Sequence, residues 1–218
     1  KDAQALEIAN KVKAIAFDKT GTLTLGKPKV QNSAYAKNQN ETKINSIVLA
    51  IESLSHHPLA QALVNYVSTK NNKLENVTDF KDHAGRGISG IIKNKKIKIG
   101  TASFMQQQGI KLDELLEKKS ETWQNQAQSI AHISIDNKHV AVFGIADTLR
   151  ESAKLVIQKL KKLNITPVML TGDNTKTAKA IASQVDIKEV KAEVLPADKE
   201  KIVRELRKQY GVVAMVGD

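Results

Sequence analysis

Three acidic residues of this chain each follow a run of apolar residues that is typical of a buried strand. Asp18 follows AIAF, Asp173 follows TPVMLTG and Asp218 follows VVAMVG. Apolar residues recur at helical spacing between the second and third runs, and this alternation predicts a parallel sheet covered on both faces. Because the carboxyl ends of parallel strands share one edge of the sheet, we expect the three carboxylates to gather there. Carboxylates in that setting can attack a phosphoryl group or bind Mg²⁺.

The residues beside Asp18 favour its use as a nucleophile toward phosphorus. In DKTGTLT, residues 18–24, a cation, hydroxyls and a glycine follow the carboxylate at once. Phosphoryl transfer depends on positioning and on neutralising charge, so we expect hydroxyls that donate to phosphate oxygens and a lysine that offsets the charge. Mg²⁺ would be held through Asp173 or Asp218. The predicted catalytic set is Asp18, Lys19, Thr20, Thr171 and Lys199, the last in LPADKEK ahead of a helix.

Two nucleotide-binding motifs are present only in part. Residues 21–27 read G-x-x-x-x-G-K, but Pro28 stands where a P-loop needs the hydroxyl that binds Mg²⁺. Residues 85–90 read G-x-G-x-x-G, but β-like sequence follows where a dinucleotide-binding fold needs a helix. A structural interpretation of the acids also stays open, with Asp18 as a turn residue and Asp173 as a helix cap.

Composition excludes several classes of function. The chain has no cysteine, which rules out disulfides, thiolate metal sites and cysteine nucleophiles. The net charge of +11 permits nucleic acid as a partner, but the basic residues are dispersed and aromatic residues make up only 4%, too few for a single-strand stacking surface. We therefore expect no nucleic-acid partner. No apolar run approaches the roughly 18 residues that a membrane-spanning helix needs.

The sequence divides into two predicted domains. The strand–helix rhythm of residues 1–26 resumes at 144–218, and residues 27–143 read as an α+β unit with a hairpin turning at Asp136–Lys138. The simplest arrangement is a discontinuous α/β domain that carries residues 27–143 as an insertion, and two connecting segments suit hinge closure. The chain begins without methionine and ends directly after a strand, so we expect a soluble piece of a larger protein.

The motifs around the three acids resemble those of a known family. DKTGTLT at 18–24, TGD at 171–173 and VGD at 216–218 are similar to the phosphorylation domain of P-type ATPases, in the haloacid-dehalogenase superfamily. The resemblance implies a haloacid-dehalogenase-like doubly wound sheet, ATP as substrate and an aspartyl phosphate at Asp18. It also implies that Mg²⁺ is held by Asp18, the Thr20 carbonyl and Asp218. Related phosphatases carry a second acid two positions after the nucleophile, where this chain has Thr20, which implies a phosphoenzyme that hydrolyses slowly.

The insertion resembles the nucleotide-binding domain of heavy-metal-transporting P-type ATPases. Ser55-His56-His57-Pro58 matches a Ser-Glu-His-Pro motif of that family, with histidine in place of the glutamate, and Gly100-Thr101 replaces a Gly-Asn pair. The resemblance implies that adenine is contacted by Glu52 and His57. The full set of nucleotide-binding residues that it implies is Glu52, His57, Gly85, Gly87, Ile88, Gly100 and Asp147.

Two of these residues also have structural interpretations. A histidine before proline, as in His57-Pro58, is typical of the entry to a helix. Asp147 and Arg150 match the family's hinge motif where the insertion rejoins the core, but Asp147 could equally cap a helix that begins near Leu149.

The resemblance implies the ATP-binding and autophosphorylating unit of a heavy-metal efflux P-type ATPase, at the cytoplasmic face of a bacterial inner membrane. Its transmembrane and actuator domains would be absent here, and the fragment would be monomeric and bind ATP with weak or no turnover. KDAQALE and LPADK look more like copper pumps, whereas Thr101 and DTLRES lean toward the zinc type; copper is slightly favoured over zinc or cadmium. A soluble phosphatase of the same superfamily is the alternative, and Thr20 argues against it.

Overall fold

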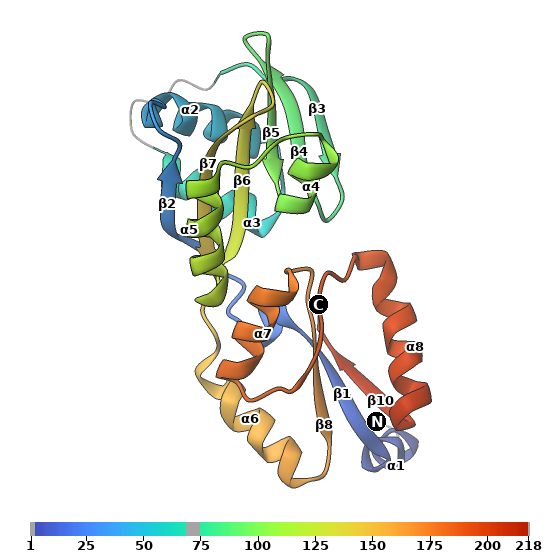
Figure 1. The fold of residues 1–218 in the computed structure, drawn as a ribbon. Helices are drawn as coiled ribbons and strands as arrows, with labels where there is room; N and C mark the ends of the chain where they lie inside the picture. The colour runs from blue at the N-terminus through green and yellow to red at the C-terminus, as the bar shows by residue number, and fades with distance from the viewer. Residues whose placement is uncertain (1–2, 69–74, 218) are drawn as a thin grey trace. The chain divides into compact units, whose positions relative to one another are not determined.

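The computed structural model describes residues 3–68 and 75–217 of the chain (Figure 1). Its backbone contacts group into two compact units. We call residues 1–26 and 147–218 the discontinuous unit and residues 27–146 the inserted unit. The sequence placed the second junction between residues 143 and 144, which lies inside strand β7 (Lys138–Ala146). No helix in the described ranges is both long enough and apolar enough to cross a membrane.

A parallel four-stranded sheet forms the centre of the discontinuous unit. Its strands, in spatial order, are β10 (Val212–Val216), β1 (Val12–Asp18), β8 (Thr166–Leu170) and β9 (Glu189–Lys191). Its helices are α1 (Ala3–Asn10), α6 (Glu151–Lys162), α7 (Thr175–Gln184) and α8 (Lys199–Tyr210). Figure 1 shows α6 and α7 on one side of the sheet and α8 on the other. This arrangement confirms the predicted doubly wound fold.

Small residues in β1 set how closely α8 approaches the sheet. Ala14 and Ala16 are completely buried and pack with Leu206 of α8 in one apolar cluster. Strand register then decides what meets at the edge of the sheet. Asp18 is paired with Leu170 at the end of β8, and Phe17 is paired with Val216 at the end of β10. The segments that follow β1, β8 and β10 therefore begin at the same edge, as predicted.

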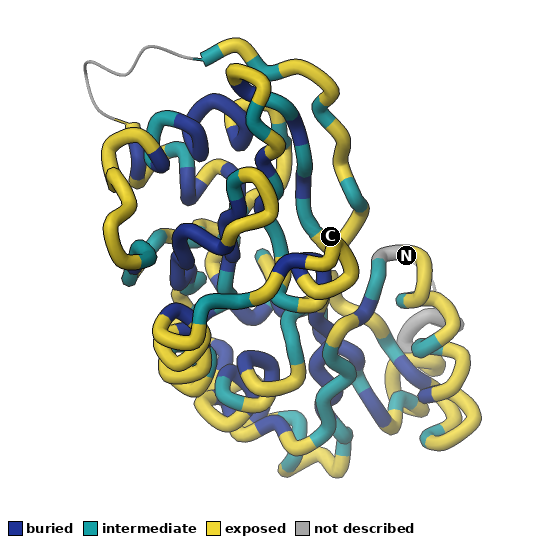
Figure 2. The backbone as a smooth tube through the Cα atoms, turned by 45° about the horizontal axis from the view of Figure 1, so that its top comes forward, coloured by how far each residue is buried: buried dark blue, intermediate teal, exposed yellow. Residues whose placement is uncertain are grey.

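A six-stranded antiparallel sheet forms the inserted unit. Its strands, in spatial order, are β2 (Lys29–Tyr35), β7, β6 (Ser129–Ile135), β5 (Lys95–Gly100), β4 (Gly87–Ile92) and β3 (Thr78–His83). Its helices are α2 (Glu41–Glu52), α3 (Pro58–Val67), α4 (Ala102–Gln107) and α5 (Glu114–Asn125). The main core lies between the sheet and the pair α2 and α3, and α2 is buried along much of its length (Figure 2).

The hairpin between β6 and β7 confirms the predicted turn. Asp136 and Asn137 both have positive φ, of 49° and 60°, which is the backbone of a type I′ turn. The register of the two strands shifts between Ile133 and Ser134. Such an irregularity changes which side chains of β6 and β7 face each other, and it bears on a buried histidine pair described below.

Candidate functional site

Asp18 is the last residue of β1, and its side chain meets the first residue of α8. The Lys199 ammonium donates to Asp18 Oδ2. Both side chains are partly exposed, so a ligand from solvent could reach them. The prediction that Lys199 lies beside Asp18 is therefore correct in its geometry. The structure reaches this arrangement because β1 and α8 share the core cluster around Ala14.

The side chain of Lys19 pairs with Asp173, in the segment that follows β8, and not with the neighbouring Asp18. Its Nζ lies 2.8 Å from Asp173 Oδ2, and both side chains are about nine-tenths buried. The Thr171 hydroxyl donates to the same Asp173 oxygen at 3.0 Å and accepts from the Asp173 main-chain N–H at 3.1 Å. Two lysines and two carboxylates thus pair crosswise at the edge of the sheet. In this structure the Thr171 hydroxyl donates to Asp173. Its predicted donation to a phosphate oxygen stays a prediction.

Asp173 is not the cap of the helix that follows it. The N-cap of α7 is Asn174, whose side-chain oxygen accepts from the Thr177 main-chain N–H at 3.0 Å. The helix-cap interpretation of Asp173 is therefore wrong. The carboxylate is directed instead to the ammonium of Lys19.

A tight turn over residues 19–23 shapes the loop after Asp18. The Thr24 main-chain N–H donates to the Lys19 carbonyl at 3.1 Å, and Gly21 has a φ of 77°, a left-handed conformation that glycine adopts without strain. Arg150 Nη2 donates to the Gly21 carbonyl at 2.8 Å. Thr20 lies within this turn and is exposed. Thr20 is therefore accessible to solvent, two residues after Asp18.

Asp147 joins the two segments through which the chain leaves and re-enters the discontinuous unit. Its Oδ2 accepts from the Thr24 hydroxyl at 2.6 Å and from the Gly26 N–H at 3.1 Å. Helix α6 begins at Glu151, and its N-cap is Arg150, so the interpretation of Asp147 as a helix cap is wrong. Asp147 lies outside the inserted unit, and its predicted contact with nucleotide stays a prediction.

The residues near Asp18 fit a Mg²⁺ ion. Gly217, after β10, packs directly on Asp18: a Cβ at this position would lie 2.9 Å from Asp18 Cβ. The Asp18 carboxylate and the Thr20 carbonyl are hard oxygen donors of the kind that Mg²⁺ prefers. No cluster of three or more acidic or histidine ligands is found among the residues that the structure describes. Asp218 lies outside the described residues, so its role as a metal ligand stays a prediction.

Glu52 ends helix α2 and is the most perturbed acid of the inserted unit. It is 5% exposed. Burial, together with the nearby charge of Asp82, raises the pKa of the Glu52 carboxyl to about 8. A buried acid of this kind is typical of a functional site, although structural acids can be perturbed as well.

His57 has the helix-entry role that a histidine before proline suggests. It is the N-cap of α3, and its Nδ1 accepts from the Leu59 main-chain N–H at 3.2 Å. The side chain is exposed. The helix-entry interpretation is confirmed, and the contact with adenine stays a prediction.

The glycines of the inserted unit have a packing explanation. Gly87 and Gly100 are paired across β4 and β5, and a Cβ on either would come within 3.0 Å of the Phe104 ring and of the other glycine. Gly85 has a φ of 70° in the turn before β4. Ile88 is buried in the main core. The predicted role of these residues in lining a nucleotide pocket stays a prediction.

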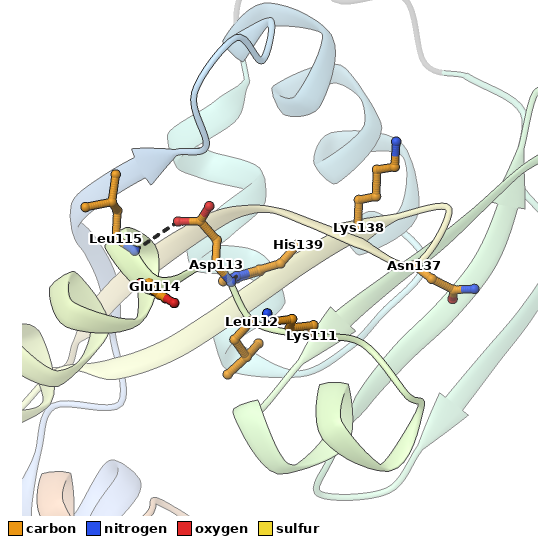
Figure 3. A pocket seen from close by; sticks show the side chains of 8 residues that line it. All are labelled: Lys111, Leu112, Asp113, Glu114, Leu115, Asn137, Lys138 and His139. Carbon is orange, nitrogen blue, oxygen red and sulfur yellow. Dashed lines mark hydrogen bonds between the residues drawn. The ribbon is translucent and has the colours of Figure 1, made fainter.

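A buried histidine pair was not found from the sequence. The Asp113 main-chain N–H donates to His139 Nδ1 at 3.0 Å, and His139 Nε2 lies 3.1 Å from His132 Nδ1. Burial lowers the pKa of His132 to about 3 and that of His139 to about 4. His139 also borders a hollow of about 550 Å³ between the start of α5 and the β6–β7 turn (Figure 3). The hollow contains none of the residues predicted to bind nucleotide.

Comparison with known proteins finds one family model and several relatives that match nearly the whole length of this chain. The sequence model of the haloacid dehalogenase-like hydrolases matches residues 12–218. The chain is 38% identical to the probable copper-transporting ATPase PacS of Synechocystis sp., over its full length, and 41% identical to a probable cadmium-transporting ATPase of Alkalihalophilus pseudofirmus, over 98% of its length. It spans 30% of the length of each of these relatives.

Solved structures give a matching result. The catalytic domain of the CPx-ATPase CopB-B superposes with a TM-score of 0.76 at 28% identity, covering all of this chain and 75% of that one. A zinc-transporting PIB-type ATPase superposes with a TM-score of 0.61 at 32% identity, covering all of this chain and 35% of that one. The similarity therefore extends over both units, and the relatives carry copper, cadmium or zinc in their names.

Proposed function

This chain belongs to the haloacid dehalogenase-like hydrolases, and on that premise we propose that it is the ATP-binding and autophosphorylating unit of a heavy-metal efflux P-type ATPase. The observation that supports this most is the crosswise pairing of Asp18 with Lys199 and of Lys19 with Asp173 at one edge of the parallel sheet. Such a site offers a carboxylate nucleophile together with fixed cations, which are the two requirements of phosphoryl transfer to an acid.

In the proposed reaction, a carboxylate oxygen of Asp18 attacks the γ-phosphorus of ATP. The new O–P bond forms as the bond between the γ-phosphorus and the bridging oxygen breaks, and ADP leaves with that oxygen and its electron pair. Lys199, already bonded to Asp18 Oδ2, stabilises negative charge on the phosphoryl group as it arrives. Asp18, the Thr20 carbonyl and Asp218 would hold Mg²⁺, which would supply further charge neutralisation when bound.

The side chain at position 20 supports a phosphoenzyme that persists. Related phosphatases carry an acid two positions after the nucleophile, which deprotonates the attacking water. Thr20 is exposed and carries a hydroxyl where those phosphatases have a carboxylate, and a threonine hydroxyl does not act as a base at neutral pH. The aspartyl phosphate is therefore expected to hydrolyse slowly, as a transport cycle requires.

The inserted unit is proposed to bind the adenine of ATP through Glu52 and His57, with Gly85, Gly87, Ile88 and Gly100 beside them. His57 Nδ1 accepts a main-chain N–H at the start of α3, so the ring is fixed at that helix end. Hinge closure at the segments joined by Asp147 would bring the γ-phosphate to Asp18. Asp147 Oδ2 links Thr24 to Gly26, one residue before the insertion begins, which supports a hinge role for this acid.

The proposed pump exports a heavy metal, with copper favoured over zinc and cadmium. Its transmembrane and actuator domains would be the partners of this unit, and the unit would lie at the cytoplasmic face of the membrane. Similarity to copper- and cadmium-transporting ATPases supports a heavy metal as cargo, and the chain spans 30% of the length of each of these relatives. The preference for copper rests on the segments KDAQALE and LPADK.

Labelling with γ-³²P-ATP tests the proposal. The parent protein should acquire acid-stable, hydroxylamine-sensitive label, and Asp18→Asn should acquire none while it still binds ATP. Asp113→Asn is the matched control, because Asp113 caps α5 and asparagine is an equally good cap. Label in the Asp18→Asn protein would overturn the nucleophile assignment. Steady turnover of small phosphomonoesters without accumulation of label would favour a soluble phosphatase.

A further inference from the structure

The carboxyl group of Glu52 is buried without a partner. Its residue is 5% exposed, and within residues 3–68 and 75–217 no hydrogen bond or ion pair reaches either oxygen. The group is nevertheless not sealed off. Among the described side chains, only one polar atom is both completely shielded from solvent and without a hydrogen-bond partner, and that atom is His132 Nε2. Because the Glu52 oxygens also lack a partner, they cannot be completely shielded, and both must keep some access to solvent. A small ligand could therefore form hydrogen bonds with this carboxyl group.

The surroundings of Glu52 favour its neutral form. Helix α2 packs mainly against α3, whose only titratable side chain is Tyr66, and against β4, which has none. The titratable residues on the neighbouring strand β3 and on the segment before α3 are Asp79, Lys81, Asp82, His83, His56 and His57. Of these described residues, only Asp82 acts on Glu52 through its charge, and that charge is of like sign.

Burial and a like charge both penalise the ionised carboxylate, and they raise the pKa of Glu52 to about 8. At neutral pH the group is therefore mainly a carboxylic acid. A carboxylic acid has one O–H donor and one carbonyl acceptor, whereas a carboxylate can only accept. This difference decides which edge of a base the side chain can recognise.

We propose that Glu52 binds the adenine of ATP as a neutral acid, donating its O–H to the N1 acceptor of the ring while its carbonyl accepts from the exocyclic amino group. This inference rests on the proposed function of the inserted unit as the adenine-binding unit. An ionised Glu52 has no donor, so its oxygen would face the lone pair of adenine N1 and repel it.

Nucleotide binding is then linked to a proton. Because only the protonated site binds adenine well, ATP affinity should be constant below the pKa of Glu52 and fall up to tenfold for each pH unit above it. Above that pKa, binding should take up close to one proton from the buffer. Measurements between pH 7.5 and 9.5 avoid the titration of the ATP phosphates, whose second pKa is near 6, and that of exposed histidines.

Titration calorimetry of ATP with the 218-residue chain tests the inference. Measurements at pH 8.5 in two buffers of different ionisation enthalpy should reveal uptake of about three-quarters of a proton, and measurements at pH 9.5 an uptake close to one. Glu52→Gln, whose amide has the same donor and acceptor arrangement as the neutral acid, should keep the affinity measured at pH 7.5 and lose both the pH dependence and the proton uptake. Glu52→Ala should weaken binding at every pH.

Asp82→Asn supplies a matched variant outside the binding groups. Asp82 is exposed on β3, and removing its charge should lower the pKa of Glu52 and move the fall in affinity to lower pH. ATP binding that is independent of pH, without proton uptake, would overturn the inference but leave adenine binding intact. Equal losses in Glu52→Gln and Glu52→Ala would overturn it as well. Absence of ATP binding at any pH would overturn the proposed function itself.

Discussion

Lys19 Nζ lies 2.8 Å from Asp173 Oδ2, although Lys19 follows the proposed nucleophile directly in sequence. The two adjacent residues Asp18 and Lys19 therefore serve different partners, and the ammonium that reaches Asp18 comes from Lys199. This crossing ties the end of β1 both to the segment after β8 and to the start of α8. The lysine of DKTGTLT consequently pairs with Asp173, and the ammonium beside the proposed nucleophile is that of Lys199.

Removing Lys19 should destabilise the discontinuous unit. Lys19→Met deprives a carboxylate that is about 10% exposed of its ammonium partner, and breaking one side of such a buried pair costs about 3–5 kcal/mol. Denaturant unfolding measures this loss. Lys11→Met is the matched control, because the Lys11–Glu7 pair is more than 60% exposed on both sides and should change stability by less than about 1 kcal/mol.

A double-mutant cycle then separates the pair from the individual side chains. Lys19→Met combined with Asp173→Asn should cost about 1–3 kcal/mol less than the sum of the single variants, because the double variant leaves no buried charge unpaired. Simple additivity would contradict a direct interaction in solution.

Replacing Lys199 should slow phosphorylation without abolishing ATP binding. Lys199→Ala removes the cation bonded to Asp18 Oδ2, and loss of one group that stabilises transition-state charge lowers rates by about 10²–10³. Rapid-quench measurement of phosphoenzyme formation gives the rate. Lys201→Ala, an exposed lysine of the same helix, is the control and should react normally. Equal rates in the two variants would remove Lys199 from the site.

The convergence of Asp18, Asp173 and Lys199 could be predicted from the sequence because it depends on strand ends and helix starts. Parallel strands with continuous apolar runs place their carboxyl ends at one edge, whatever their detailed packing. The pairing of Lys19 could not be predicted in the same way. Its direction depends on the turn over residues 19–23, whose shape is held by Arg150, far away in sequence.

The partners of Asp147 and of the buried histidines were missed for related reasons. The sequence around Asp147 suggested either a nucleotide contact or a helix cap. Its contact with Thr24 forms because the segment that follows the inserted unit lies beside the segment that precedes it. His132 and His139 lie on a hairpin that was predicted correctly. The register shift between Ile133 and Ser134 decides that these two side chains meet, and no feature of a single sequence specifies such a shift.

The histidine pair should make the inserted unit sensitive to acid. Asp113 N–H donates to His139 Nδ1, so the proton of neutral His139 lies on Nε2 and is donated to His132 Nδ1. The proton of His132 then lies on Nε2, which has no partner among the described residues. A second proton on either ring would have to sit on its Nδ1, which already accepts a hydrogen bond. Protonation of either histidine would therefore place two donors against each other.

The pKa of both histidines is accordingly lowered in the folded state, to about 3 and about 4. The unfolded chain, with histidine pKa values near 6.5, binds protons below that pH which the folded chain does not bind. Stability should therefore be complete above pH 6.5 and fall as the pH is lowered toward 4, by up to about 1.4 kcal/mol per pH unit for each histidine. Urea unfolding at pH 7, 6 and 5 measures this slope.

His132→Phe tests whether the pair causes that acid sensitivity. The variant has one histidine fewer to protonate on unfolding, so its slope should be shallower by about one proton, whatever its stability at pH 7. His56→Asn, at an exposed position before α3, should keep the parent slope. If His132→Phe kept the parent slope, His132 would already be charged in the folded protein, which the one-directional donation from Asp113 through His139 does not permit.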